Sequence, residues 1–189
     1  MTPGYDGPQT VPLPLELWGD ERTLPRGLTA RYRSWLLEDG LMSQRMRADG
    51  AGAVRLELVG ERLAFLSEEQ QRLLKVSTSA CFARETALYS GARAWVYSQA
   101  LIPDAALELS PWLAALGSSE LEATLYGLAT LTRGTREFAL MAASHTLIAR
   151  ALNGAQVAPA ALWARRTWHA LHGQRFLIQE VFLPALGRS

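Results

Sequence analysis

The chain has 189 residues, of which 49% are hydrophobic, and a formal net charge of +1. This size and composition predict one domain with a sizeable core, and the near-neutral charge gives no electrostatic reason to expect nucleic acid or an anionic membrane as a partner. The single cysteine, Cys81, excludes an internal disulfide and favours a reducing cytoplasm. No apolar run approaches the roughly 20 residues needed to cross a bilayer, so we expect no membrane insertion.

The N-terminal segment, residues 1–26, contains five of the nine prolines. Because proline cannot continue a helix or a central strand, this composition predicts an extended lead-in. Leu13, Leu15 and Trp18 are the candidate anchors of this segment on the body of the protein. Residues 27–189 are then expected to form a single domain.

The middle of the chain alternates between helical and extended patterns. Helices are predicted over residues 28–37, from residue 41, over 68–74, within 104–116, over 121–128 and over 145–152. Ser67 and Gln70 have the spacing of a capping box at the start of the third of these helices. Strands are predicted over residues 54–59 with 63–66, 76–89, 94–102 and 130–141, the last one broken around Gly134. The first three strands indicate an antiparallel meander.

The C-terminal residues predict a β-hairpin with arms at 162–171 and 176–184. A two-residue loop at Gly173 and Gln174 would place Thr167 opposite Glu180, with Arg165 and His169 on the same face. His169 and His172 are expected to be solvated or hydrogen-bonded surface groups. Their spacing on a strand and its turn does not favour a metal site.

Two charged residues stand out, because each is the single charge on an otherwise core-like strand face. They are Arg84, on the strand over 76–89, and Glu180, on the last strand. A buried salt bridge between them would satisfy both. Alternatively they line a pocket, where Arg84 offers a two-point fork to a ligand carboxylate and Glu180 contacts a hydroxyl or moves a proton.

Several short stretches, taken in order, resemble the chorismate lyase family. They are Trp35-Leu36-Leu37-Glu38-Asp39 followed by Met42, Arg84-Glu85 with Trp95, Leu131-Thr132-Arg133, Leu162-Trp163-Ala164-Arg165-Arg166, and Glu180-Val181-Phe182-Leu183-Pro184. The resemblance covers residues 34 to 184. It implies an α+β fold: a single antiparallel β-sheet with helices packed around it and short helical flaps over a buried ligand pocket.

The resemblance also implies an enzyme, a lyase that converts chorismate to 4-hydroxybenzoate and pyruvate as the first committed step of ubiquinone ring supply. The family's buried arginine and glutamate match Arg84 and Glu180. Its two main-chain N–H contacts, from mobile segments over the pocket, match Met42 and Leu121. No cofactor or metal is implied, and we expect a cytoplasmic monomer whose partners are the substrate and the product.

One departure from the family pattern is Gln99, which stands where members often carry an arginine, and an outer substrate contact could be weaker for that reason. The alternative function is therefore a non-catalytic aromatic-acid-binding protein of the same fold, either a sensor or a degenerate lyase. A similar fold serves as the effector-binding domain of GntR-type regulators. Residues 1–26, rich in proline, cannot supply the helix-turn-helix that such regulators carry.

Overall fold

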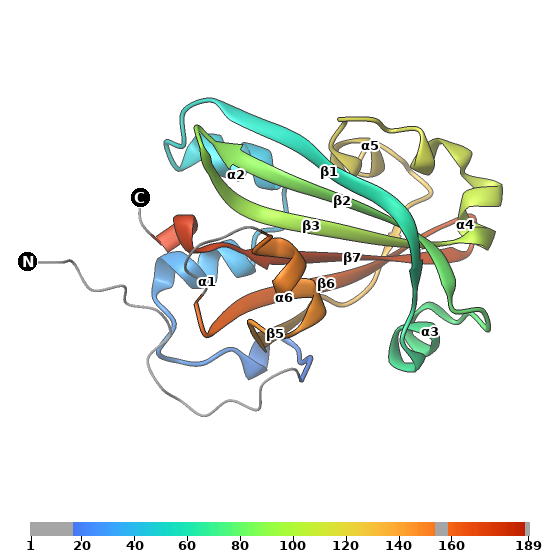
Figure 1. The fold of residues 1–189 in the computed structure, drawn as a ribbon, viewed down its shortest axis with the longest axis horizontal. Helices are drawn as coiled ribbons and strands as arrows, with labels where there is room; N and C mark the ends of the chain where they lie inside the picture. Colours follow the sequence, from blue (N-terminus) through green and yellow to red (C-terminus); the bar gives the residue numbers. More distant parts are fainter. Residues whose placement is uncertain (1–16, 154–158, 188–189) are drawn as a thin grey trace, which may run out of the picture.

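The computed structural model describes residues 17–153 and 159–187. Seven strands form one antiparallel sheet in the order β1-β2-β3-β7-β6-β4, and β5 also pairs with β6 (Figure 1). The strands are Val54–Phe65 (β1), Ala80–Ser90 (β2), Arg93–Pro103 (β3), Thr132–Arg133 (β4), Glu137–Ala142 (β5), Ala161–Leu171 (β6) and Gln174–Phe182 (β7). The predicted α+β fold with a single antiparallel sheet is confirmed.

Short helices surround this sheet, with α1 and α2 toward the left end and α4 and α5 toward the right end in Figure 1. The helices are Ala30–Leu36 (α1), Met42–Ala48 (α2), Glu68–Leu74 (α3), Asp104–Leu109 (α4), Leu121–Leu125 (α5) and Thr146–Ala151 (α6). Three 3-10 turns, Glu21–Thr23 (η1), Pro111–Ala114 (η2) and Pro184–Gly187 (η3), complete the described elements. Among these residues, none of the helices has the length and apolarity that a bilayer span requires.

The predicted meander is present as β1, β2 and β3, but β2 begins at Ala80 and not at residue 76. Residues 76–79 close the loop after α3, where Val76 donates its N–H to the Gln71 carbonyl at 3.1 Å. The predicted capping box of α3 is confirmed, since Ser67 and Gln70 each accept a hydrogen bond from the other residue's backbone N–H. The hydrogen bond that closes the end of α3 keeps residue 76 out of the sheet, so β2 begins later than predicted.

The hairpin of β6 and β7 turns at His172 and Gly173, which both have positive φ, 52° and 80°. Two positive φ values in succession are the signature of the turn type that matches the twist of a hairpin. The predicted loop was one residue later, so the predicted pairing of Thr167 with Glu180 is wrong. Arg165 lies opposite Glu180 instead. Moving the loop by one residue shifts the strand pairing by two residues. Because side chains alternate with a period of two, each of them stayed on its predicted face.

The sheet face that carries Arg84 and Glu180, here called the site face, holds two separate apolar clusters. One packs under α1 and α2 and includes Leu36, Met42, Met46, Val96 and Phe182. The other packs under α4 and α5 and includes Ala100, Ile102, Leu113, Leu125 and Phe176. A band of polar residues runs between the two clusters, and this band holds the candidate site.

The lead-in is described only from residue 17, so Leu13 and Leu15 lie outside the described residues. Trp18 is half-buried, packs against an apolar cluster on the opposite face, and has the Arg166 guanidinium 4.5 Å from its ring centroid. Gly19 forms a β-bridge with Phe138 of β5. Trp18 thus anchors the segment to the sheet, as predicted.

Candidate functional site

Glu180 lies on β7, where Arg165 of the neighbouring strand β6 is its direct partner. The Arg165 Nη2 donates to Glu180 Oε1 at 2.9 Å, and Nε donates to the other carboxylate oxygen. Nη1 of the same guanidinium donates to the carbonyls of Leu36 and Glu38, at 3.3 and 2.7 Å. Arg165 and Glu180 are both buried. The carboxylate is therefore held by a two-point ion pair whose cation is also fixed to the end of α1.

Arg84 of β2 is also buried, but its partners come from elsewhere in the chain. Nη1 donates to Glu61 Oε1 at 2.8 Å, and Nη2 donates to the carbonyls of Gly117 and Ser119 at 2.6 and 3.0 Å. Its Nε is buried and has no hydrogen-bond partner in residues 17–153 and 159–187. Arg84 thus holds the segment that leads into α5.

The structure keeps Arg84 and Glu180 on one face without joining them. Arg84 pairs across the sheet with Ala100, and Glu180 pairs with Ser98. Two strand spacings and a two-residue step therefore separate them, about 12 Å between Cα atoms. The buried salt bridge between the two residues, one of the two alternatives drawn from the sequence, is not formed.

Small side chains form the floor between Arg84 and Glu180. Thr86 of β2 and Ser98 of β3 lie opposite each other, and both are only half-buried. Ala100 lies one pleat further along β3. Small residues at the centre of a sheet face, flanked by two packed clusters, leave room for something other than the protein's own side chains.

Met42 and Leu121 are the first residues of α2 and α5, and the structure brings these two helix ends together. Ser43 Oγ donates to Glu120 Oε2 at 2.6 Å, which joins the residue after Met42 to the residue before Leu121. Neither helix has a side-chain cap at its N-terminus. The first backbone N–H groups of both helices thus lack the usual intrahelical acceptor and a side-chain substitute.

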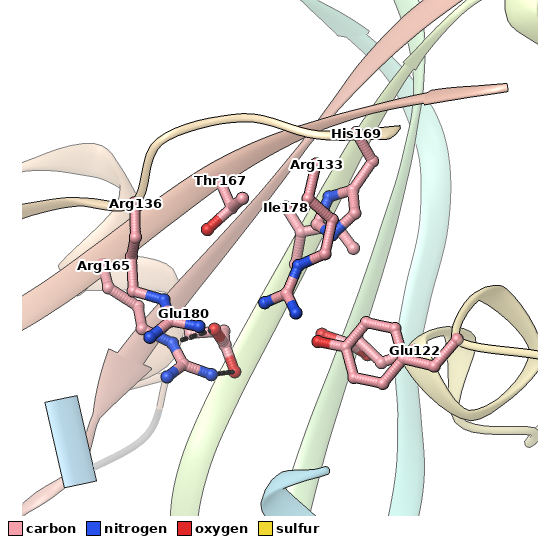
Figure 2. Close-up of a pocket in the computed structure, with 9 residues that line it drawn as sticks. Glu122, Arg133, Arg136, Arg165, Thr167, His169, Ile178 and Glu180 are labelled. Atoms are coloured by element: carbon pink, nitrogen blue, oxygen red, sulfur yellow. Dashed lines mark hydrogen bonds and ion pairs between the residues drawn. The ribbon is translucent and has the colours of Figure 1, made fainter. Parts of the chain in front are cut away.

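A small cavity opens beside Glu180, between the sheet and α5 (Figure 2). Its volume is about 10 Å³, roughly the room for one water molecule. The cavity is lined by Glu122, Tyr126, Arg133, Arg136, Arg165, Thr167, His169, Ile178 and Glu180. Of the site residues predicted from sequence, only Glu180 lines it. Arg84, Met42 and Leu121 lie outside its wall, although Leu121 directly precedes Glu122.

Glu122 carries a second carboxyl group into this cavity. Burial raises the pKa of Glu122 well above its usual range, and the nearby charge of Glu180 raises it further. The Arg165 cation acts in the opposite direction but does not outweigh these two causes. Glu122 therefore favours its neutral form more than an ordinary carboxyl group does.

His169 corrects the expectation of a surface histidine, because the residue is buried and only 2% exposed. Its ring stacks on Phe176 with centroids 5.6 Å apart, and neither ring nitrogen makes a hydrogen bond of ordinary geometry in the described part of the chain. Burial, with a smaller contribution from the Arg133 charge, lowers the pKa of His169 to about 4. The imidazole is therefore neutral at pH 7. Across residues 17–153 and 159–187, no group of three His, Cys, Asp or Glu side chains could hold a metal ion.

The predicted break at Gly134 is confirmed, and it positions two arginines of the cavity wall. Gly134 donates its N–H to the Trp168 carbonyl at 2.8 Å, and a Cβ at residue 134 would stand 2.1 Å from the Trp168 ring. Only glycine fits such a close approach. Arg133 at the end of β4 and Arg136 just before β5 then both reach the cavity.

Gln99 lies on the face of the sheet opposite the site face. Its amide nitrogen donates to Glu85 Oε1 at 3.0 Å, and its amide oxygen accepts from Gln179 at 3.0 Å. Glu85 also accepts from Arg62 and Arg150, so this second polar band is internally paired. The departure at Gln99 therefore changes a structural network and leaves the surroundings of Glu180 untouched.

Sequence reasoning placed Glu180 and Arg84 on one face but missed most of the cavity wall. It did not identify Glu122, Tyr126 or Arg136 as site residues. Arg133 and Arg165 both belong to stretches that resemble the lyase family. Their place in those stretches was the sequence signal that could have identified them as site residues. For Glu122 the signal was its position directly after Leu121.

Comparisons with known proteins bear on the family and the fold of this chain. The family described as chorismate lyase matches residues 18–187. A probable chorismate pyruvate-lyase of Dechloromonas aromatica is 33% identical over 82% of this chain and 87% of that protein, and one of Coxiella burnetii is 31% identical over 89% and 92%. The effector domain of PhnF from Mycobacterium smegmatis shares the fold, with a TM-score of 0.52 at 17% identity over 76% of this chain and 88% of that chain. With a match across nearly its whole length, this chain belongs to the chorismate lyase family.

Proposed function

We propose that this protein is a lyase that converts chorismate to 4-hydroxybenzoate and pyruvate. The observation that carries the proposal is the family match over residues 18–187. Arg84 and Glu180, which the resemblance assigns to the site, lie on one sheet face, and this supports it. The same family match supports supply of the aromatic ring for ubiquinone as the biological role. The buried, single Cys81 suits a reducing cytoplasm.

The ring carboxylate of the substrate is assigned to Arg84 and to the N–H groups of Met42 and Leu121. Arg84 Nη1 is paired with Glu61, but Nη2 donates only to two main-chain carbonyls next to α5, and a ligand carboxylate accepts from Nη2 more strongly than these carbonyls do. The N–H groups at the starts of α2 and α5 add two donors on the same side of the sheet. Cation and N–H donors together form a site for one planar anion.

Glu180 is assigned to the ring hydroxyl that becomes the phenol. Each carboxylate oxygen accepts a single hydrogen bond from Arg165, which leaves lone pairs free for a ligand hydroxyl. Arg165 also fixes the carboxylate in place, so that little reorganisation is needed when the substrate binds.

The reaction breaks the ether bond between the ring and the enolpyruvyl group. The ring carbon that bears the hydroxyl loses its proton, the ring becomes aromatic, and the released enolpyruvyl group gains a proton at its methylene carbon to become pyruvate. No electron acceptor enters this balance. The site contributes by holding a reactive conformer and by stabilising the charge that moves toward the departing oxygen.

Substrate entry requires the segments over the site to move, because the cavity holds roughly one water molecule and a substituted ring needs far more room. The elements that must move are the start of α2 and the segment from Gly117 through α5. The Ser43–Glu120 hydrogen bond joins them in the closed state. Closure over a flat product makes slow product release an expected feature of the cycle.

The direct test is incubation of the purified protein with chorismate alone, followed by measurement of pyruvate and 4-hydroxybenzoate. We expect both products in equal amounts. Glu180→Ala should lose most of the turnover, and Arg84→Ala should abolish binding of substrate and product. Glu57→Gln, an exposed carboxylate on β1, is the matched control and should keep full activity.

The alternative, a protein that binds aromatic acids without converting them, gives a different outcome in the same experiment. The wild type would then bind 4-hydroxybenzoate in a titration but release no pyruvate from chorismate. Glu180→Ala turnover within a few-fold of wild type would remove that residue from the mechanism. Unchanged product affinity of Arg84→Ala would contradict its role with the carboxylate.

A further inference from the structure

Chorismate carries two carboxylates, and the assignments above use only one of them. Arg84 and the N–H groups of Met42 and Leu121 face the ring carboxylate, and Glu180 faces the hydroxyl. The carboxylate of the enolpyruvyl group still needs a partner, because a charge taken out of water without compensation opposes binding. The cavity wall contains three arginines that could supply it.

Two of these arginines are already paired with carboxylates. Arg165 is bound to Glu180, and Arg136 Nη2 donates to Asp39 Oδ1 at 2.7 Å. For Arg133 no ion pair with an acidic side chain is formed within the residues that the structure describes. Its recorded hydrogen bond is a long one, 3.5 Å from Nη1 to the Asp39 carbonyl. Arg133 is thus the cavity cation with its charge available for a ligand.

The position of Arg133 suits a ligand contact. Its guanidinium lies 4.8 Å from the Tyr126 ring centroid, and β4 pairs Arg133 with His169. Stacking on an aromatic ring occupies one flat face of a guanidinium and leaves its N–H edge free. Figure 2 shows this group extending into the space between the Arg165–Glu180 pair and Glu122. The side chain is exposed, so an anion can approach it from solvent.

We propose that Arg133 binds the enolpyruvyl carboxylate of chorismate through a two-point ion pair and so selects ring acids that carry a second carboxylate. This inference rests on the proposed lyase function. The cavity charges agree with it: Glu180 offsets Arg165, Asp39 offsets Arg136, and the raised pKa of Glu122 favours its neutral form, which leaves the charge of Arg133 for an anionic ligand. His169 beside Arg133 is neutral at pH 7, so it neither repels Arg133 nor compensates its charge.

A consequence is that Arg133 distinguishes substrate from product. The enolpyruvyl carboxylate leaves as part of pyruvate, so 4-hydroxybenzoate has nothing for Arg133 to bind. Loss of Arg133 should therefore weaken ligands with two carboxylates and spare the product. For a charge-assisted contact at an exposed guanidinium we expect a loss of about tenfold.

The test compares two ligands that do not react, by calorimetric titration of wild type and Arg133→Gln. One ligand is 4-hydroxybenzoate, and the other is 3-(carboxymethoxy)-4-hydroxybenzoate, which adds a second carboxylate on an ether at the ring carbon next to the hydroxyl. Arg55→Gln is the matched control, because Arg55 is also exposed and stacks on a tyrosine ring, Tyr89, at 4.6 Å. Arg133→Lys keeps the charge without the fork.

We expect Arg133→Gln to bind the dicarboxylate about tenfold more weakly and 4-hydroxybenzoate within twofold of wild type, with Arg133→Lys between the two and Arg55→Gln unchanged. The KM for chorismate should rise in parallel. Equal losses for both ligands, or no loss for the dicarboxylate, would overturn the subsite. Failure of the lyase proposal would appear separately, as a wild type that releases no pyruvate, because the titrations need no turnover.

Discussion

Replacing Arg165 by methionine removes the cation that pairs with Glu180 and keeps a long apolar side chain in its place. In the wild type the two side chains are 5% and 7% exposed, so the variant buries an unpaired carboxylate. Loss of one partner from a buried ion pair costs about 3–5 kcal/mol. The carbonyls of Leu36 and Glu38 also lose their donor, which adds on the order of 1 kcal/mol. We expect a total loss of about 4–6 kcal/mol.

The assay is equilibrium unfolding in urea at pH 7, followed by circular dichroism. A loss of this size lowers the urea midpoint by about 2–3 M, if the free energy of unfolding falls by about 2 kcal/mol per molar urea. Arg55→Met, at an exposed pair with Glu57, is the control and should cost less than about 1 kcal/mol. The double variant Arg165→Met with Glu180→Leu should be more stable than Arg165→Met, because neither charge is then left unpaired.

The result that would refute this reasoning is a loss below about 1 kcal/mol for Arg165→Met. A double variant whose loss equals the sum of the two single losses would also refute it. Either outcome would mean that water reaches Glu180 in the folded protein. The claim that the carboxylate is held rigidly for the substrate would then fail as well.

Three further predictions concern the closing segments and the titrating groups. Ser43→Ala removes the hydrogen bond to Glu120, so the segments over the site should open more easily and release product several times faster. The rate is measured by stopped-flow fluorescence of bound 4-hydroxybenzoate, and an unchanged rate would exclude this contact from the closed state. The pKa of His169 is lowered in the folded protein, so the free energy of unfolding of the wild type falls by up to about 3 kcal/mol as the pH drops from about 6.5 to about 4. His169→Leu should lose this part of the pH dependence, as measured by urea unfolding at several pH values. The pKa of Glu122 is raised in the folded protein, so its contribution to the free energy of unfolding is present at low pH and is lost as the pH rises above the usual carboxyl range. Glu122→Gln should therefore gain stability relative to wild type between pH 5 and pH 9. A constant difference in stability across that range would contradict this prediction.

The elements that depend on local patterns could be predicted from the sequence. The capping box at Ser67 and Gln70 predicted the start of α3, and the alternation from Val54 predicted β1. The apolar and β-branched residues around Glu180 predicted β7 and the face it shares with Arg165. In each case the signal comes from residues a few positions apart, where capping and side-chain alternation act.

The hairpin register could not be predicted, because its turn uses a histidine at positive φ. His172 adopts φ 52°, a conformation that non-glycine residues rarely take, so Gly173 and Gln174 were the more ordinary choice of loop. Register is set by such turn details and by packing on the two faces of the sheet. The pairing of Arg165 with Glu180 followed from that one turn.

The partners of Arg84 could not be predicted either, because they are distant in sequence. Glu61 reaches Arg84 only because an irregularity between Leu58 and Gly60 shifts the β1–β2 register. The carbonyls of Gly117 and Ser119 come from the segment before α5. No periodicity in the sequence encodes contacts of this kind, and burial alone left several partners possible for the arginine.

The contact between Ser43 and Glu120 joins two short helices, of seven and five residues, whereas Glu180 and Arg165 lie in the central strands of the sheet. Amide hydrogens of α2 and α5 should exchange through local opening, while those of β7 should exchange only on global unfolding. Ligand dissociation and unfolding therefore follow separate routes. Substitution of Ser43 or Glu120 can change how long a product stays bound while leaving the melting temperature of the sheet almost unaltered.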